Sequence, residues 1–188
     1  MNAHMLYPNE PSTTAYIRGF FQRKKVAYTE EGLIAVLQDN SSSKMAVYLA
    51  VLGLRDVGTG MCIPSLKAKL HYPMQDVKDC SILTIAHIAG ATETRYYVEA
   101  LHDKKTRKAY PMWAIRDAAN AGAIDPVLDY VTLEIRKLSK GVAPGDAFIF
   151  AIEYLVQFRC DDPRIEALLR VTGKYYDPAT PTHWPVAP

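Results

Sequence analysis

The residues of this sequence that are best suited to chemistry gather on one face of a helix predicted over 109–121. At about 100° per residue, four of them share its polar side: Trp113, Arg116, Asp117 and Asn120. Exposed aromatic side chains surrounded by charged groups are typical of binding hot spots. A tryptophan in the middle of a polar face therefore favours non-covalent recognition of a partner.

A second set of residues occupies the corresponding face of a later helix, predicted over 145–159. The offset is 37 residues, the spacing between Pro126 and Pro163, and it aligns Phe150, Glu153 and Tyr154 with the first set. If neighbouring helical hairpins stack, the two sets form one partner-binding patch. The alternative is that the rings pack between hairpins and that Arg116 pairs with Glu153 as a purely structural contact.

Further candidates for partner binding lie on the exposed sides of the second helices of two predicted hairpins. These residues are Arg95, Glu99, Asp129 and Tyr130. Mixed charge of this kind suits specific protein recognition and is unsuited to a DNA-binding cradle. A solvated helix face gives the same pattern.

Basic residues recur near the ends of the second helices and would form a basic edge. Its members are Lys67, Lys104, Lys105, Arg107, Lys108 and Lys137, with Lys69, Arg136 and Lys140 beside them. Such an edge would attract an acidic partner or a phosphate backbone. The preference of cations for helix C-termini, about 0.3–1 kcal/mol each, explains the pattern equally well.

Motifs for catalysis and metal binding are missing from the sequence. It has no GxxxxGK[ST], no GxGxxG and no HExxH, and none of its five histidines lies four residues from another metal ligand. We therefore expect no catalytic residue, no metal and no cofactor.

The elements that must position these residues are helical hairpins. Gly58, Gly90 and Gly122 recur every 32 residues, each at the end of an apolar helical run, and a fixed period of this length is typical of stacked hairpins. The predicted pairs are 44–57 with 61–71, 75–89 with 93–103, 109–121 with 125–139, and 145–159 with 163–172. Two helices precede them, one capped within 12–14 and one opening at Thr29.

The ends of the chain differ from this array. Residues 1–11 form a loose lead-in, 12–172 form one domain, and 173–188 form an extended tail. The tail contains Pro178, Pro181, Pro185 and Pro188, which cannot continue a helix, and it carries Trp184.

Composition is that of an ordinary globular protein. The chain has 188 residues, of which 49% are hydrophobic and 22% are charged, and a net charge of +2 gives no general reason to expect nucleic acid as a partner. Its three cysteines form no CxxC motif, which indicates reduced thiols. With no signal peptide and no membrane-spanning stretch in the sequence, we predict a cytoplasmic protein without a membrane partner.

The chain resembles the HEAT-like repeats, especially the short-repeat form found in phycobilisome lyases. Two segments carry the resemblance, 76–90 and 114–122, in which small residues precede a glycine and a second apolar helix follows. The resemblance implies an all-α, right-handed solenoid of about four to five hairpins, with the second helices lining its concave surface.

Solenoids of this kind are usually binding surfaces, so the predicted function is that of a protein-binding module. One form is a stoichiometric inhibitor, such as an immunity protein that neutralises a toxin or effector; the other is a scaffold or adaptor. The alternative is a HEAT-like DNA glycosylase or another nucleic-acid-binding protein. In the glycosylase, Trp113 would stack on a base, Asp117 would stabilise charge and Arg116 would bind phosphate. A bilin lyase or a membrane-linked regulator are further possibilities, and the oligomeric state stays open.

Overall fold

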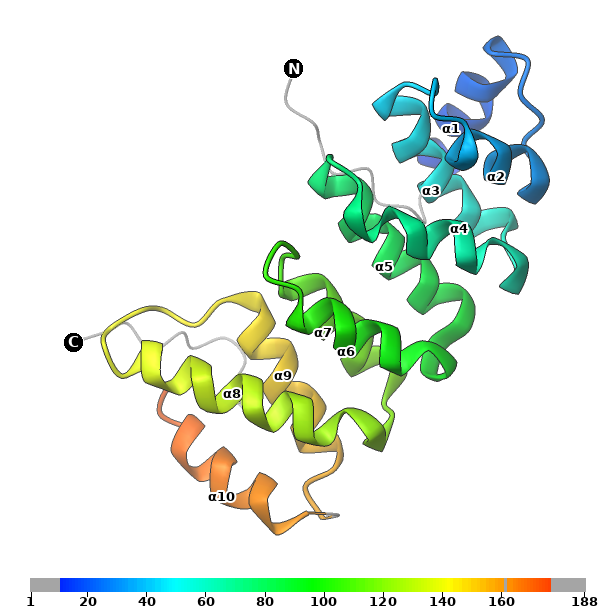
Figure 1. Ribbon diagram of the computed structural model, residues 1–188. Coiled ribbons are helices and arrows are strands. Elements are labelled where there is room, and N and C mark those ends of the chain that lie inside the picture. The colour runs from blue at the N-terminus through cyan, green and yellow to red at the C-terminus, as the bar shows by residue number, and fades with distance from the viewer. Residues whose placement is uncertain (1–10, 161, 177–188) are drawn as a thin grey trace. The chain divides into compact units, whose positions relative to one another are not determined.

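The computed structural model describes residues 11–160 and 162–176, and every regular element in these ranges is a helix (Figure 1). The α-helices are α1 (Pro11–Arg23), α2 (Glu30–Gln38), α3 (Lys44–Val57), α4 (Ile63–Lys67), α5 (Gln75–Ala89), α6 (Thr94–His102), α7 (Ala109–Ala118), α8 (Ile124–Leu138), α9 (Asp146–Gln157) and α10 (Pro163–Thr172). Short 3-10 helices are η1 (Gly60–Cys62), η2 (Ala68–His71), η3 (Gly90–Glu93) and η4 (Ala121–Ala123). The chain is therefore all-helical over its described part, as the sequence predicts.

Backbone contacts divide the chain into two compact units, residues 1–89 and 90–188, where the sequence predicts one domain over 12–172. Most of the predicted lead-in and of the predicted tail, including Trp184, lies outside the described residues. The described part of the tail, 173–176, begins with a turn in which the amides of Tyr175 and Tyr176 donate to the Thr172 carbonyl.

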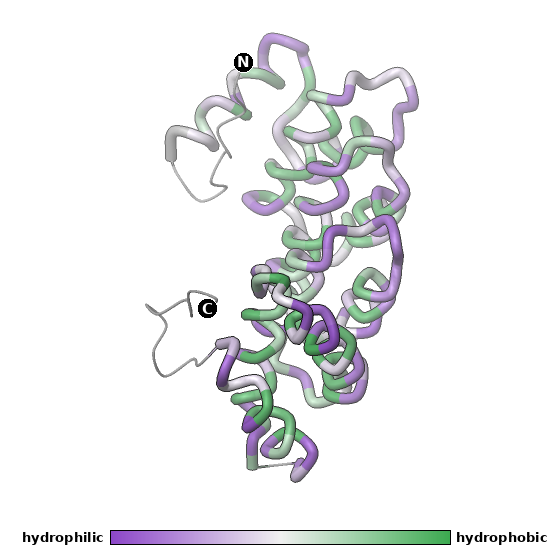
Figure 2. The backbone as a smooth tube through the Cα atoms, turned by 90° about the vertical axis from the view of Figure 1, so that its left-hand side faces the viewer, coloured by the Kyte–Doolittle hydropathy of each residue, from purple (hydrophilic) through white to green (hydrophobic). Residues whose placement is uncertain are grey.

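The core of the first unit is built around α3, whose sequence runs apolar from Ala46 to Leu54. That whole stretch is buried except for Tyr48, and α3 packs against α1, α2 and α5. A helix that is apolar on every side must be surrounded by other elements, which explains its central place. Elsewhere hydrophilic and hydrophobic residues alternate along much of the backbone (Figure 2). Helix α8, for example, buries Val127, Leu128, Val131 and Leu138, which share one side.

The core of the second unit is formed by α7 and α9, which lie side by side (Figure 1). Phe148, Ile152 and Leu155 of α9 and Met112 and Ile115 of α7 are buried together with residues of the neighbouring helices. Helices α6 and α8 pack on α7 and α9 respectively, and α10 packs on α8 and α9. The polar sides of α7 and α9 therefore emerge next to each other.

Three short 3-10 helices recur along the chain at a shorter interval than the glycines do. The 3-10 helices η1, η3 and η4 begin at residues 60, 90 and 121, and the α-helices directly after them begin at 63, 94 and 124, so the interval is 30 or 31 residues. Gly58 follows α3 and Gly90, with φ 51°, follows α5, but Gly122 lies inside η4. Helix α7 ends at Ala118 because Ala119 takes the left-handed conformation, with φ 47°. The prediction that Gly122 ends this helix is wrong.

The turns at η1, η3 and η4 each form hydrogen bonds with a buried side chain from an adjoining helix. The Glu30 carboxylate accepts from the amides of Thr59 and Cys62, at 2.7 and 3.1 Å. The hydroxyl of Tyr97 donates to the Gly90 carbonyl at 2.9 Å, and that of Tyr154 to the Asn120 carbonyl at 2.7 Å. These bonds satisfy backbone groups that the ends of the helices leave unpaired.

Candidate recognition surface

Five residues of α7 and α9 form the candidate site, which we call the Trp113 cluster. They are Trp113, Arg116 and Asp117 on α7 and Phe150 and Glu153 on α9. The rings of Trp113 and Phe150 lie 5.7 Å apart between centroids and are tilted by 40°, and Trp113 is 38% exposed. The predicted meeting of the two helix faces is therefore present in the structure.

Arg116 lies at the centre of the Trp113 cluster. Its guanidinium carbon is 4.6 Å from the Phe150 ring centroid and 5.9 Å from that of Trp113. Its Nη1 donates to Glu153 Oε2 at 2.7 Å, and its Nε donates to Asp117 Oδ1 at 2.8 Å. Burial alone would lower the pKa of Arg116, but the bonds to Glu153 and Asp117 outweigh it and raise the pKa. Arg116 is thus permanently charged and held in one orientation.

Asp117 holds the tryptophan as well as the arginine. The indole Nε1 of Trp113 donates to Asp117 Oδ2 at 2.8 Å, while the other carboxylate oxygen accepts from Arg116. The spacing of four residues on one helix makes the first of these bonds possible. This bond therefore holds the exposed ring in one orientation.

Tyr154 and Asn120 do not belong to the exposed cluster. Tyr154 is fully buried beneath the η4 turn, where its hydroxyl meets the Asn120 carbonyl. Asn120 caps that same turn, because its Oδ1 accepts from the Gly122 amide at 2.8 Å. The expectation that Tyr154 is available to a partner is wrong, since its ring fills the interior.

The other predicted binding residues lie apart from the Trp113 cluster. Arg95 and Glu99 form an exposed ion pair at 3.0 Å along α6, and Asp129 and Tyr130 lie on α8. In the described part of the chain, no hydrogen bond or ion pair joins these four to the cluster. Burial raises the pKa of Tyr130, so the half-buried phenol is a neutral group.

The basic residues do not share one structural setting. Lys67 is in the last turn of α4 in the first unit, and Lys137 is in the last turn of α8, where it pairs with Glu134 at 2.6 Å. Lys104, Lys105, Arg107 and Lys108 follow the end of α6, in the segment before α7. The Nζ of Lys108 donates to the Asp103 carbonyl, and burial lowers the pKa of Lys108. The basic edge stays a prediction.

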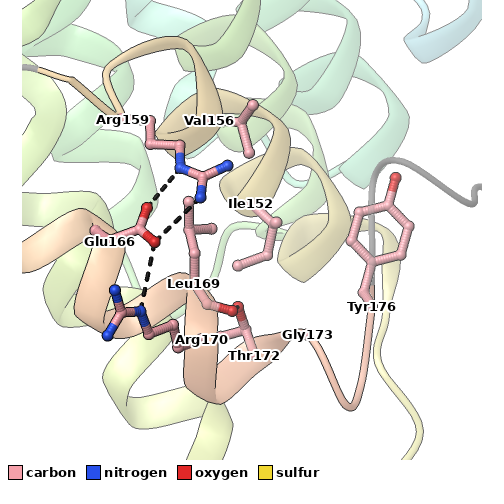
Figure 3. A pocket seen from close by; sticks show the side chains of 9 residues that line it. All are labelled: Ile152, Val156, Arg159, Glu166, Leu169, Arg170, Thr172, Gly173 and Tyr176. Carbon is pink, nitrogen blue, oxygen red and sulfur yellow. Dashed lines mark hydrogen bonds and ion pairs between the residues drawn. The ribbon is translucent and has the colours of Figure 1, made fainter.

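A pocket of about 290 Å³ between α9 and α10 has no counterpart among the sequence predictions (Figure 3). It is lined by Ile152, Val156, Arg159, Glu166, Leu169, Arg170, Thr172, Gly173 and Tyr176. We call it the α9–α10 pocket. Ile152 and Val156 are four residues apart on one helix face, a signal that indicates apolar packing but does not separate a pocket from a core.

Two kinds of feature are absent from the part of the chain that the structure describes. Among residues 11–160 and 162–176, no three His, Cys, Asp or Glu side chains gather where a metal ion could be held. No helix in these ranges combines the length and apolar character needed to cross a bilayer.

Comparison with known proteins found no relative of this chain. The chain matches no family model, no curated protein and no solved structure.

Proposed function

We propose that this chain is a protein-binding module that recognises its partner through the Trp113 cluster, presented on a HEAT-like array of hairpins. The observation that carries the proposal is the exposed Trp113 ring, fixed by Asp117 and backed by Arg116 and Phe150. Tryptophan and arginine are the residue types most enriched among interface hot spots.

The charged groups of the Trp113 cluster suit recognition better than catalysis. Arg116 is paired with both Asp117 and Glu153, so neither carboxylate is poised as a free base. A nucleophile with a base within hydrogen-bond reach is the usual sign of covalent catalysis, and the cluster contains none. Its groups instead hold one another in place, as preorganised binding surfaces require.

Two forms of this function follow from the sequence. A stoichiometric inhibitor, such as an immunity protein that neutralises a toxin, would use the cluster to cover a partner's functional surface. A scaffold or adaptor would use it to join other proteins. A toxin-like protein encoded next to this chain would favour the first form.

A HEAT-like DNA glycosylase is the alternative, and the geometry gives it less support. Its phosphate ligand would be Arg116, which two carboxylates already engage. Its base-stacking and charge-stabilising residues would be Trp113 and Asp117, which are bound to each other. Titration with duplex DNA at low salt tests this alternative, because affinity for phosphates falls steeply as salt rises. Absence of low-salt binding would exclude it.

The proposed function is tested by affinity capture with the wild-type chain and the Trp113→Ala variant. We expect the wild type to capture one protein in a one-to-one complex, identified by mass spectrometry. Trp113→Ala should weaken that complex by about 30-fold, the effect of losing a hot spot of about 2 kcal/mol. Leu133→Ala is the matched control, because Leu133 is an exposed apolar residue on α8, outside the cluster. Equal binding by Trp113→Ala and wild type would refute the proposal.

A further inference from the structure

The α9–α10 pocket combines an apolar floor with a charged side. Ile152 and Leu169 lie at its centre, and Val156, which is 39% exposed, stands at its rim on α9. The charged residues Arg159, Glu166 and Arg170 are at one side, and Tyr176 is at the other (Figure 3). Ligand-binding sites are typically lined by apolar side chains, and a few polar or charged groups fix the orientation of the ligand.

The charged side carries a surplus of positive charge. Glu166 accepts from Arg159 on both oxygens, at 2.5 and 3.1 Å, so this pair is bidentate. Arg170 reaches the same carboxylate through Nε at 3.4 Å, a longer contact. This contact involves Nε of Arg170, and 78% of the side chain is exposed. Two guanidinium groups thus face one carboxylate, and the second remains available to another anion.

The pocket is continuous with the Trp113 cluster through one residue. The hydroxyl of Tyr176 donates to Glu153 Oε1 at 3.2 Å, while Glu153 Oε2 accepts from Arg116. Tyr176 lines the pocket and Glu153 belongs to the cluster, so one hydrogen bond links the two sites.

We propose that the α9–α10 pocket is a second recognition site, which takes an apolar side chain next to an aspartate or glutamate of a protein partner. The apolar side chain would lie on Leu169 and Val156, above the buried Ile152, and the adjacent carboxylate would pair with Arg170. Charge complementarity selects this occupant, because Arg159 and Arg170 outnumber Glu166. The inference deepens the proposed function by stating the chemistry of the partner's contact segment.

The test uses dipeptide probes and the ¹⁵N-labelled full chain, observed by NMR. The probe is acetyl-Asp-Phe amide, compared with acetyl-Asn-Phe amide, which lacks the charge, and acetyl-Asp-Ala amide, which lacks the ring. We expect saturable shifts at residues 152–176 with a dissociation constant on the order of 1 mM, as befits so small a ligand. Each comparison probe should bind about fivefold more weakly.

A charge-reversal pair distinguishes the pocket from general electrostatic attraction. Arg170→Glu should weaken binding of acetyl-Asp-Phe amide by about fivefold or more, through loss of the pairing and added repulsion. Arg136→Glu makes the same change at an arginine in the last turn of α8 and should leave binding within about twofold. The proposal is overturned if no saturable shift occurs at 152–176, if the Asn probe binds equally well, or if the two variants weaken binding alike. Because these probes are read without the partner, failure here is distinct from failure of the capture experiment on Trp113→Ala.

Discussion

The guanidinium of Arg116 on α7 donates from Nη1 to Oε2 of Glu153 on α9 across 2.7 Å. The remaining oxygen of Glu153 accepts from the Tyr176 hydroxyl at 3.2 Å. The Glu153 carboxylate on α9 therefore links Arg116 of the Trp113 cluster to Tyr176, which lines the α9–α10 pocket. The pair is half-buried, with side-chain exposures of 23% and 33%, so solvent screens it only in part.

We predict that Arg116 and Glu153 are energetically coupled. A double-mutant cycle with Arg116→Ala and Glu153→Ala, measured by urea denaturation, should give a coupling free energy of about 1 kcal/mol. The exposed pair Arg95–Glu99 is the control, and its cycle should give about 0.3–0.5 kcal/mol, as exposed pairs within one helix do. Coupling of the half-buried pair below that of the exposed one would contradict the assigned geometry.

Asp117 should control the mobility of Trp113. Replacing Asp117 by Ala removes the acceptor of the indole N–H, and the exchange of that proton with solvent, followed by NMR, should accelerate about tenfold. Asp117→Asn is the control, because its amide oxygen still accepts from the indole while the ion pair with Arg116 is lost. If Ala and Asn variants exchange at the wild-type rate, the tryptophan is not fixed by this residue.

Glu30 should stabilise the first unit through the η1 turn. Burial alone would raise the pKa of Glu30, but hydrogen bonds from Thr59 and Cys62 outweigh it and hold the pKa below its ordinary value. Glu30→Gln should lower the free energy of unfolding by about 1–3 kcal/mol, because it weakens charge-assisted bonds in a buried place. Glu31→Gln, at the adjacent exposed position, should change it by less than about 0.5 kcal/mol.

The pH dependence of this effect has a definite sign. Since the folded-state pKa of Glu30 is lowered, its contribution is fully present above the unfolded-state pKa of about 4.3 and is lost as pH falls through the folded-state value. The difference in unfolding free energy between wild type and Glu30→Gln should therefore shrink as pH is lowered below about 4. A difference that is constant with pH would refute the role of the carboxylate.

The helices of this chain could be predicted from sequence because their signals are local. Thr29 and Ser43 cap α2 and α3, and Asp162 caps α10 ahead of Pro163. The meeting of Arg116 with Glu153 followed from matching helix faces, which needs only the order of the hairpins. From sequence, that pairing is the structural alternative to a binding patch, and the structure contains both the pairing and an exposed tryptophan.

What could not be predicted depends on tertiary contacts. Tyr154 is four residues from Phe150 on the same helix, yet its ring is buried and its hydroxyl donates to the Asn120 carbonyl, a contact that depends on where α9 meets the η4 turn. The α9–α10 pocket depends on how closely α10 approaches α9. The periodicity of hydrophobic residues in the sequence does not indicate that distance. The end of α7 at Ala118 carries no glycine signal, because Ala119 takes the left-handed conformation that a glycine usually provides.

The three cysteines should differ sharply in reactivity. Cys62 and Cys80 are shielded, and burial raises the pKa of Cys62 to about 11 and that of Cys80 to about 12. Cys160 is exposed. Because the thiolate is the reactive form, iodoacetamide at neutral pH should label Cys160 alone in the native chain and all three cysteines in denaturant, as read by peptide mass spectrometry. Rapid native labelling of Cys62 or Cys80 would contradict their placement.

Ala119→Gly should stabilise the second unit. Ala119 has φ 47° and ψ 44°, which is a left-handed conformation. The Cβ atom crowds the backbone there at a cost of about 1 kcal/mol, whereas glycine adopts this conformation freely. Glycine also adds freedom to the unfolded chain, which opposes the gain, so we expect a net increase of about 0.5 kcal/mol in the free energy of unfolding. Ala121→Gly is the control. Residue 121 is exposed in η4 at negative φ, so this substitution should only lower the free energy of unfolding. If both variants are destabilised equally in urea denaturation, Ala119 is not strained and the assigned end of α7 is wrong.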